Sequence, residues 1–125
     1  MANPSYHEPI DKLSETTQDL HRALRSLMEE LEAIDWYQQR VDATSDAALR
    51  RILAHNRDEE IEHAAMTLEW IRRHHPAFDA ALRTYLFTEG DVTALEERAS
   101  GATAGAPPTL HPSPLTTIGS LRQRS

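Results

Sequence analysis

Two long stretches of the chain carry apolar residues at helical spacing. In the first, from about residue 10 to residue 41, there is no Gly or Pro, and Leu or Ile recurs at intervals of three, four and seven. Such intervals place side chains on one face of a helix. The positions are Leu13, Leu20, Leu24, Leu27, Leu31 and Ile34. The pattern predicts a long first helix over residues 10–41.

A second long helix follows a short turn. Residues 42–46, DATSD, are turn-forming, and either Ser45 or Asp46 is suited to cap the next helix at its amino end. Since proline disfavours helical geometry in the residue before it, the second helix is expected to end at about His75, before Pro76.

Beyond Pro76 the predicted elements become shorter. Residues 79–87 indicate a third helix that ends or kinks at Gly90, and residues 92–98 add a helical turn. Residues 99–114 are uncharged and rich in Gly, Pro and small side chains, which is typical of a flexible linker. We therefore expect a helical domain over residues 1–98, a linker over 99–114 and a terminal peptide over 115–125.

Apolar side chains lie on more than one side of the second helix. One arc consists of Ile61, Ala64, Ala65, Leu68 and Ile71, whereas Ile52 and Trp70 lie off that arc. Two long helices and a short third cannot enclose a large core. The predicted fold is therefore all-α, an antiparallel two-helix hairpin with a short C-terminal helix, which forms a four-helix bundle by two-fold dimerisation.

The charge of the chain is unevenly distributed. Residues 1–98 hold all 20 acidic residues and 11 of the 13 basic ones, a net charge of −9, whereas residues 99–125 carry +2 from Arg122 and Arg124. An acidic body disfavours nucleic acid as a partner, because phosphate binding needs a basic surface. It favours the attraction of cations.

Several classes of protein are disfavoured by what the sequence lacks. There is no cysteine, which excludes disulfides, thiolate metal sites and cysteine nucleophiles. No apolar run approaches the roughly 20 residues that cross a bilayer, and the first residues show no secretory signal pattern. We expect a cytoplasmic protein without a membrane partner.

Three residues in the two long helices have the chemistry of a metal site. Glu60 and His63 are three residues apart and share a helix face, while Glu30 lies on the flank of the leucine arc of the first helix. Di-metal centres in helix bundles take a Glu from each of two helices and a Glu-x-x-His pair from each of two others. This chain has one helix of each kind, so a second copy would complete the site.

The ligand types suit iron, manganese or zinc, since they are carboxylates and an imidazole without soft sulfur. Iron(II) gives up one electron and reduction of O₂ to peroxide takes two, so two adjacent irons are a natural minimum for a ferroxidase. On spacing alone the alternative stays open, because a chain rich in Glu and His can contain one such pair by chance, and acidic helix faces are usually solvated.

Further polar residues lie away from these faces. They are His55, Glu59 and Glu62 on the second helix, and Glu29 and Glu32, with Trp36, on the first. Either they collect and guide cations or they are ordinary exposed charges. Tyr37 lies on the Glu30 side, where it could hydrogen-bond a ligand, supply an electron or simply pack.

The terminal peptide contains three apolar side chains spaced by three, Leu115, Ile118 and Leu121. Such a segment cannot fold alone. It either docks into a groove of a partner or is a frayed end.

Two stretches, SLMEELEAIDWYQQR (26–40) and HNRDEEIEHAAMTLEWIRRHHPAFDAALRTYLFTE (55–89), closely resemble encapsulated ferritin. The segment LTTIGSLR (115–122) resembles the targeting peptide of encapsulin cargo proteins. The resemblance implies a half-ferritin hairpin that dimerises into a four-helix ferroxidase unit, and dimers that assemble into a decameric ring. It also implies that iron is oxidised inside an encapsulin shell, which then holds the ferric product.

The resemblance also implies roles for individual residues. Glu30, Glu60 and His63 of both chains match the di-iron ligands. Tyr37, beside Trp36, matches an aromatic near that site. Glu29 and Glu32 match a metal-uptake position. A peripheral metal position is matched by His55, Glu59 and Glu62.

Two other functions are compatible with the same residues. One is a rubrerythrin-like di-iron peroxidase, which would turn over peroxide faster than it oxidises iron with O₂. The other is a non-catalytic scaffold in which metal ions only join the chains. Metal-dependent assembly alone would not separate them, because ligands shared across an interface couple binding to association.

Overall fold

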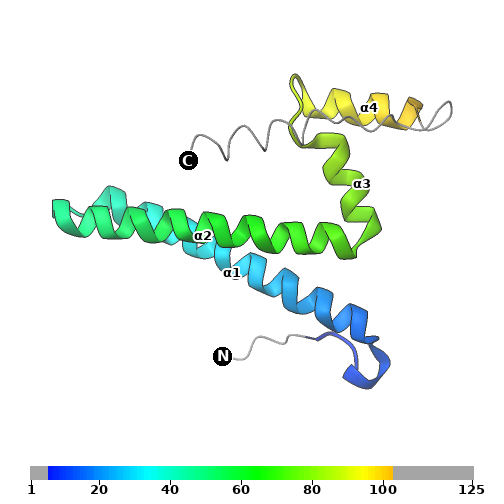
Figure 1. The fold of residues 1–125 in the computed structure, drawn as a ribbon, viewed down its shortest axis with the longest axis horizontal. Coiled ribbons are helices and arrows are strands. Elements are labelled where there is room, and N and C mark those ends of the chain that lie inside the picture. Colours follow the sequence, from blue (N-terminus) through cyan, green and yellow to red (C-terminus); the bar gives the residue numbers. More distant parts are fainter. Residues whose placement is uncertain (1–5, 103–125) are drawn as a thin grey trace. The chain divides into compact units, whose positions relative to one another are not determined.

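The computed structural model describes residues 6–102, in which all regular structure is helical. A short 3₁₀ helix, η1 (Ile10–Lys12), precedes four α-helices, which are α1 (Glu15–Ala43), α2 (Ala47–His74), α3 (Pro76–Tyr85) and α4 (Val92–Ala102) (Figure 1). The chain divides into two compact units, residues 1–79 and 80–125, and each is described by itself. The prediction of an all-α fold is confirmed.

The first long helix begins later than its apolar pattern predicts. Residues 10–12 form η1, and Leu13 is extended with φ −100° and ψ 131°. Ser14 then caps α1, because its hydroxyl oxygen accepts a hydrogen bond from the Thr17 amide at 3.1 Å. A serine at this position satisfies an amide that the helix leaves unpaired. The spacing of apolar residues could not show that Ser14 caps the helix and that α1 therefore begins at Glu15.

The turn after α1 is short and held by polar side chains. Asp46, one of the two predicted caps, accepts a hydrogen bond from the Leu49 amide at 2.9 Å and starts α2. The Arg50 side chain reaches back across the turn and donates to the carbonyl oxygens of Val41 and Thr44. These bonds join the adjacent ends of α1 and α2, which pack against each other as an antiparallel hairpin (Figure 1).

The boundary between α2 and α3 is a single residue. α2 ends at His74, close to the predicted end, but α3 begins at Pro76 rather than at Asp79. Proline is favoured in the first helical position, because its fixed φ suits a helix and its missing amide would be unpaired there. His75 separates the two helices, and its Nδ1 atom accepts from the Phe78 amide at 3.3 Å. Pro76 therefore ends one helix and starts another.

The second unit contains the end of α3 and all of α4. α3 ends at Tyr85, and Phe87 and Gly90 then have positive φ values of 59° and 87°. Asp91 accepts a hydrogen bond from the Thr93 amide at 3.0 Å, at the start of α4. α4 continues to Ala102, past the predicted end at residue 98 and into the predicted linker. The rest of that linker and the 115–125 peptide lie outside the described residues.

The hairpin buries little apolar surface by itself. Among the described side chains, only Ala64 and Ile71 are buried, and both belong to α2. Many large apolar side chains of the hairpin remain exposed, among them Met28, Leu31, Trp36, Leu49, Ile52, Ile61 and Met66. A helix pair with so little core is expected to bury these side chains against a further surface. No helix within residues 6–102 has the length and apolar character needed to span a membrane.

Candidate metal centre

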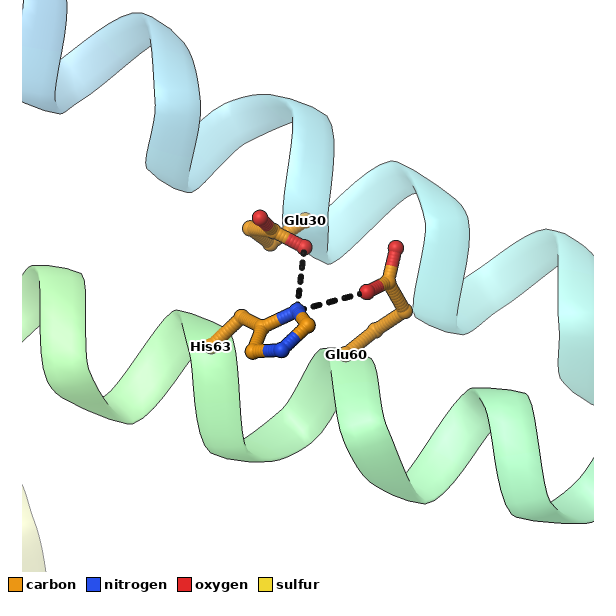
Figure 2. Close-up of side chains that lie close together, drawn as sticks. All are labelled: Glu30, Glu60 and His63. Atoms are coloured by element: carbon orange, nitrogen blue, oxygen red, sulfur yellow. Dashed lines mark hydrogen bonds and ion pairs between the residues drawn. The ribbon is translucent and has the colours of Figure 1, made fainter.

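Glu30, Glu60 and His63 meet at the face that α1 and α2 share (Figure 2). We call these three residues the triad. Glu30 comes from α1, and the other two come from successive turns of α2. Two long antiparallel helices place the Glu30 side chain opposite those of Glu60 and His63. Within the described residues, this is the only group of three or more His or acidic side chains with mutually close ligand atoms.

The three ligand atoms converge on one point. His63 Nδ1 lies 2.9 Å from Glu60 Oε1 and 3.8 Å from Glu30 Oε2, and all three potential ligand atoms lie within 4.8 Å of one another. The Glu30 and Glu60 side chains are 24% exposed and His63 is 45% exposed. The triad is therefore accessible from one side and partly enclosed on the other.

The spacing of these atoms fits a divalent transition-metal ion. Metal–ligand distances of about 2.0–2.2 Å separate neighbouring ligand atoms by roughly 3–4 Å. Within the triad, the distance of 3.8 Å lies in this range and the distance of 2.9 Å lies just below it. Hard carboxylate oxygens combined with one imidazole suit iron, manganese or zinc. One chain offers three protein ligands, which leaves coordination positions open.

The pKa values of Glu30 and His63 are both raised, which shows that the triad has too little positive charge to neutralise its carboxylates. Partial burial and the nearby Glu60 carboxylate raise the pKa of Glu30, against a smaller lowering by His63. The hydrogen bond to Glu60 is the main cause that raises the pKa of His63, and the Glu30 charge adds to it. Without a cation, the triad therefore holds protons more firmly than separated groups would. A metal ion would replace those protons.

The backbone carbonyl of His63 accepts a hydrogen bond from the Thr67 hydroxyl at 2.9 Å. Thr67 follows His63 by one helical turn on the same face. The position of Thr67 in line with Glu60 and His63 could be predicted from the sequence, but its hydrogen bond could not.

The residues predicted to form the metal-uptake and peripheral positions do not form a ligand cluster like the triad. His55 Nε2 lies 3.3 Å from Glu59 Oε1, with side chains 71% and 51% exposed. Glu62 is exposed and does not join them in a close ligand group, and Glu29 and Glu32 are exposed on α1. The predicted metal-uptake and peripheral positions stay predictions.

The two predicted aromatic residues differ in their surroundings. Trp36 is 49% exposed. Tyr37 is half-buried, and the Arg40 guanidinium lies over its ring at 5.4 Å from the centroid. The structure shows no hydrogen bond between Tyr37 and the triad, so its predicted role beside the metal stays a prediction.

Two polar networks were not anticipated from the sequence. In one, Arg57 of α2 donates to Gln38 of α1 at 2.8 Å. In the other, Arg72 links Glu69 of α2 to Asp79 of α3. Arginine and glutamine are common on helix surfaces, so only the three-dimensional placement distinguishes these residues from solvated side chains.

The chain is similar to proteins whose names refer to ferritin and to encapsulin. It is 54% identical to the encapsulated ferritin-like protein of Rhodospirillum rubrum, over 94% of this chain and 88% of that protein. It is 58% identical to the ferritin-like protein of Thermotoga maritima, over 77% and 84% of the two chains. A third relative, the encapsulin nanocompartment cargo protein EncC of Myxococcus xanthus, is 35% identical over 97% of each chain.

Structure comparison shows the same fold in a solved protein. The crystal structure of protein ne0167 from Nitrosomonas europaea matches with a TM-score of 0.67 and 63% identity, over 69% of this chain and 94% of that one. The EncFtn-like family model matches residues 5–89, which include the whole hairpin and the triad. The chain therefore belongs to the EncFtn-like family.

Proposed function

We propose that the protein is a ferroxidase that oxidises iron(II) with O₂ at a di-iron centre built from the triads of two copies of the chain. The observation that carries this proposal is the convergence of Glu30, from one helix, with Glu60 and His63, from the other, around a point of metal-binding size. The family supports an iron-related role, because its relatives are named as ferritin-like proteins.

A second copy of the chain is needed for ligand number. One triad supplies two carboxylates and one imidazole, which is half the usual set of a helix-bundle di-metal site. Two triads facing each other supply four carboxylates and two imidazoles for two ions. The four carboxylates would also offset the mutual repulsion of two cations.

The surface around the triad supports the same arrangement. Ile52, Met66 and Trp70 are 57%, 62% and 36% exposed, respectively. They lie three turns before, one turn after and two turns after His63, so they share its side of α2. Apolar side chains that flank a half-exposed metal ligand set fit a surface buried by a partner. The dimer would thereby become a four-helix bundle with the metals inside.

The proposed reaction balances with two irons. Two iron(II) substrates each lose one electron, and O₂ takes both electrons with two protons to give hydrogen peroxide. In this reaction Glu30 and Glu60 bind and neutralise the ions, and His63 provides the nitrogen ligand after losing its proton. The acidic body of the chain, with a net charge of −9 over residues 1–98, attracts the cationic substrate.

We further propose that the protein is cargo of an encapsulin shell. Two relatives carry names that refer to encapsulation or to encapsulin cargo, and residues 115–122 resemble the targeting peptide of encapsulin cargo proteins. The helical domain would end near α4, and the residues after it would tether the peptide that binds the shell. Dimers would form the predicted decameric ring, and the shell would store the ferric product.

Replacement of the triad tests this function. Glu30→Ala, Glu60→Ala and His63→Ala should each abolish or severely slow oxidation of iron(II) under air, because each removes a ligand from both metals' surroundings. The chain should stay helical by circular dichroism. Glu97→Ala, an exposed carboxylate on α4, is the control and should oxidise iron at the unaltered rate. Undiminished oxidation by all three triad variants would sink the proposal.

A further inference from the structure

A polar bridge joins α1 and α2 close to the triad. Arg57 Nη1 donates to Gln38 Oε1 at 2.8 Å, and this bond connects the two helices. Each partner is also held on its own helix. The Gln38 amide donates to Asp42 Oδ1 at 3.0 Å, and Arg57 Nε and Nη2 donate to Asp58 Oδ1 at 3.1 and 2.9 Å. We call Gln38 and Arg57 the bridge.

The bridge lies in a part of the hairpin without buried apolar side chains. Both buried side chains, Ala64 and Ile71, lie on the far side of the triad from the turn. Between the turn and the triad, no described side chain is buried. Loose apolar contacts tolerate small rotations and sliding of one helix against the other. A directed hydrogen bond with fixed atoms does not.

The turn alone does not fix the alignment at the triad. Arg50 fastens the helix ends at residues 41–44, but Glu30 lies more than ten residues further along α1. The bridge is nearer. Gln38 is eight residues from Glu30, about 12 Å along the helix, and Arg57 is three residues from Glu60, about 4.5 Å along it.

The triad needs the alignment to be accurate. A shift of one residue in the pairing of α1 with α2 moves Glu30 by about 1.5 Å along the axis and about 100° around it. Metal–ligand distances, by contrast, tolerate only about ±0.2 Å. A loss of alignment would withdraw the Glu30 oxygen, which lies 3.8 Å from His63 Nδ1, while the pair within α2 would stay together.

We propose that Gln38 and Arg57 are positioning residues whose bridge sets the alignment that brings Glu30 to the Glu60–His63 pair. The bridge acts through the helices and makes no hydrogen bond or ion pair with Glu30, Glu60 or His63. The proposal rests on the triad being the metal site of the proposed function. It predicts that metal affinity depends on a hydrogen bond that lies about two helical turns from Glu30 on α1 and about one turn from Glu60 on α2.

The neighbouring glutamine provides a matched control. Gln39 donates to Asp35 Oδ1 at 3.1 Å, a bond within α1. It has the same side chain on the same helix, with an ordinary intrahelical partner. Gln38→Ala and Gln39→Ala therefore remove equivalent groups, and only Gln38→Ala removes the bond to α2. Gln38→Glu loses the donor to Asp42 but keeps an acceptor for Arg57, and it should act as the rescue variant for the bond between the helices.

Cobalt(II) binding to the full chain measures the effect, through titration and the visible absorption bands that report coordination geometry. Gln38→Ala should weaken cobalt(II) affinity about tenfold, the lower end of what is lost with groups that orient metal ligands, and should change the absorption bands. Gln39→Ala and Gln38→Glu should bind as the unaltered protein does. If Gln38→Ala loses helical content, Arg57→Lys, which keeps the charge but not the planar fork, is compared with Gln39→Ala instead.

The outcomes separate this inference from the proposed function. If Gln38→Ala binds cobalt(II) within twofold of the unaltered protein, or if Gln39→Ala weakens binding equally, the bridge does not position the site. If the unaltered protein binds cobalt(II) at the triad but does not oxidise iron, the ferroxidase proposal fails and the positioning role can still be measured.

Discussion

Two carboxylate clusters of this chain have opposite electrostatics. At the corner of α2 and α3, Glu69 receives two hydrogen bonds from Arg72, at 2.7 and 2.8 Å, and one from Arg73 at 2.6 Å. These arginines lower the pKa of Glu69 to about 2. Arg72 also pairs with Asp79 of α3. We call this network the corner.

The triad also contains glutamates, but they are not paired with arginine as Glu69 is. Partial burial and Glu60 raise the pKa of Glu30, and its ion-pair partner among the described residues is the weakly basic His63. The corner contains its own cations and is complete within the chain. Within residues 6–102, the triad forms no ion pair with an arginine or a lysine, as expected of a site that receives its cation from solution. A cluster of carboxylates therefore indicates a metal site only where no arginine or lysine side chain already neutralises the carboxylates.

The largest effect should follow from giving the triad a resident cation. Glu30→Lys would place an ammonium group against Glu60 and His63, so that the triad would resemble the corner. We expect cobalt(II) affinity to fall at least about 100-fold, because a ligand is lost and like charges repel. Isothermal titration measures the loss. Glu97→Lys makes the same change of net charge on α4 and should leave the affinity unaltered, whereas equal losses in both variants would show only a general electrostatic effect.

A smaller effect, on stability, is expected from removing the Arg72 side chain from the corner. Arg72→Ala removes the group that joins Glu69 to Asp79 and should lower the free energy of unfolding by about 1–2 kcal/mol, since the network is only partly shielded from water. Arg22→Ala removes a single exposed pair with Asp19, with side chains 65% and 56% exposed, and should cost less than about 0.5 kcal/mol. Denaturant unfolding at one fixed protein concentration compares them. Equal losses would mean that the corner is an ordinary surface pair.

The pH dependence of metal binding should distinguish the triad from a set of isolated ligands. Partial burial and the Glu60 carboxylate raise the pKa of Glu30, and the hydrogen bond to Glu60 raises the pKa of His63, so each group binds its proton more firmly than its ordinary value of 4.5 or 6.5 implies. Metal must displace these protons, and the apparent affinity should therefore rise with pH between about pH 6 and pH 8. Titrations in buffers of different ionisation enthalpy measure the released protons. His63→Ala should release fewer of them, and a pH-independent affinity would contradict the assignment.

The smallest effect should appear in acid stability. The folded-state pKa of Glu69 is depressed from 4.5 to about 2, so its contribution is complete above its unfolded value and is lost as the pH falls from there towards 2. The effect is reduced by solvent, because the Glu69 side chain is 40% exposed. Glu69→Gln should be less stable than the unaltered protein at about pH 6, and the difference should narrow towards about pH 3. A constant difference would mean that Glu69 charge does not stabilise the corner.

Much of the hairpin and its triad could be predicted from the sequence. The regular spacing from Leu20 to Ile34 predicted α1, and helical phase placed Glu60 and His63 on one face with Glu30 opposite. These inferences succeeded because long helices make side-chain direction a simple function of position. The N-terminal cap at Ser14 and the helix start at Pro76 were missed, because local hydrogen bonds decide such boundaries and apolar periodicity does not report them.

The polar networks could not be predicted in the same way. Arg57 meets Gln38, nineteen residues earlier in the chain, and Arg72 meets Asp79 around a corner. Each contact depends on which rotamers several long side chains adopt together. The sequence also could not distinguish the acids of the triad from those of the corner, since the difference lies in which cations the fold brings to each.

The most direct test of the shared site is anomalous scattering from crystals soaked in iron(II). We expect two iron peaks between two copies of the chain, related by a two-fold axis, each within bonding distance of Glu30, Glu60 and His63 ligand atoms drawn from both triads. A single iron coordinated entirely within one chain, or no iron at the triad while other acidic sites fill, would contradict a di-iron centre formed by two copies.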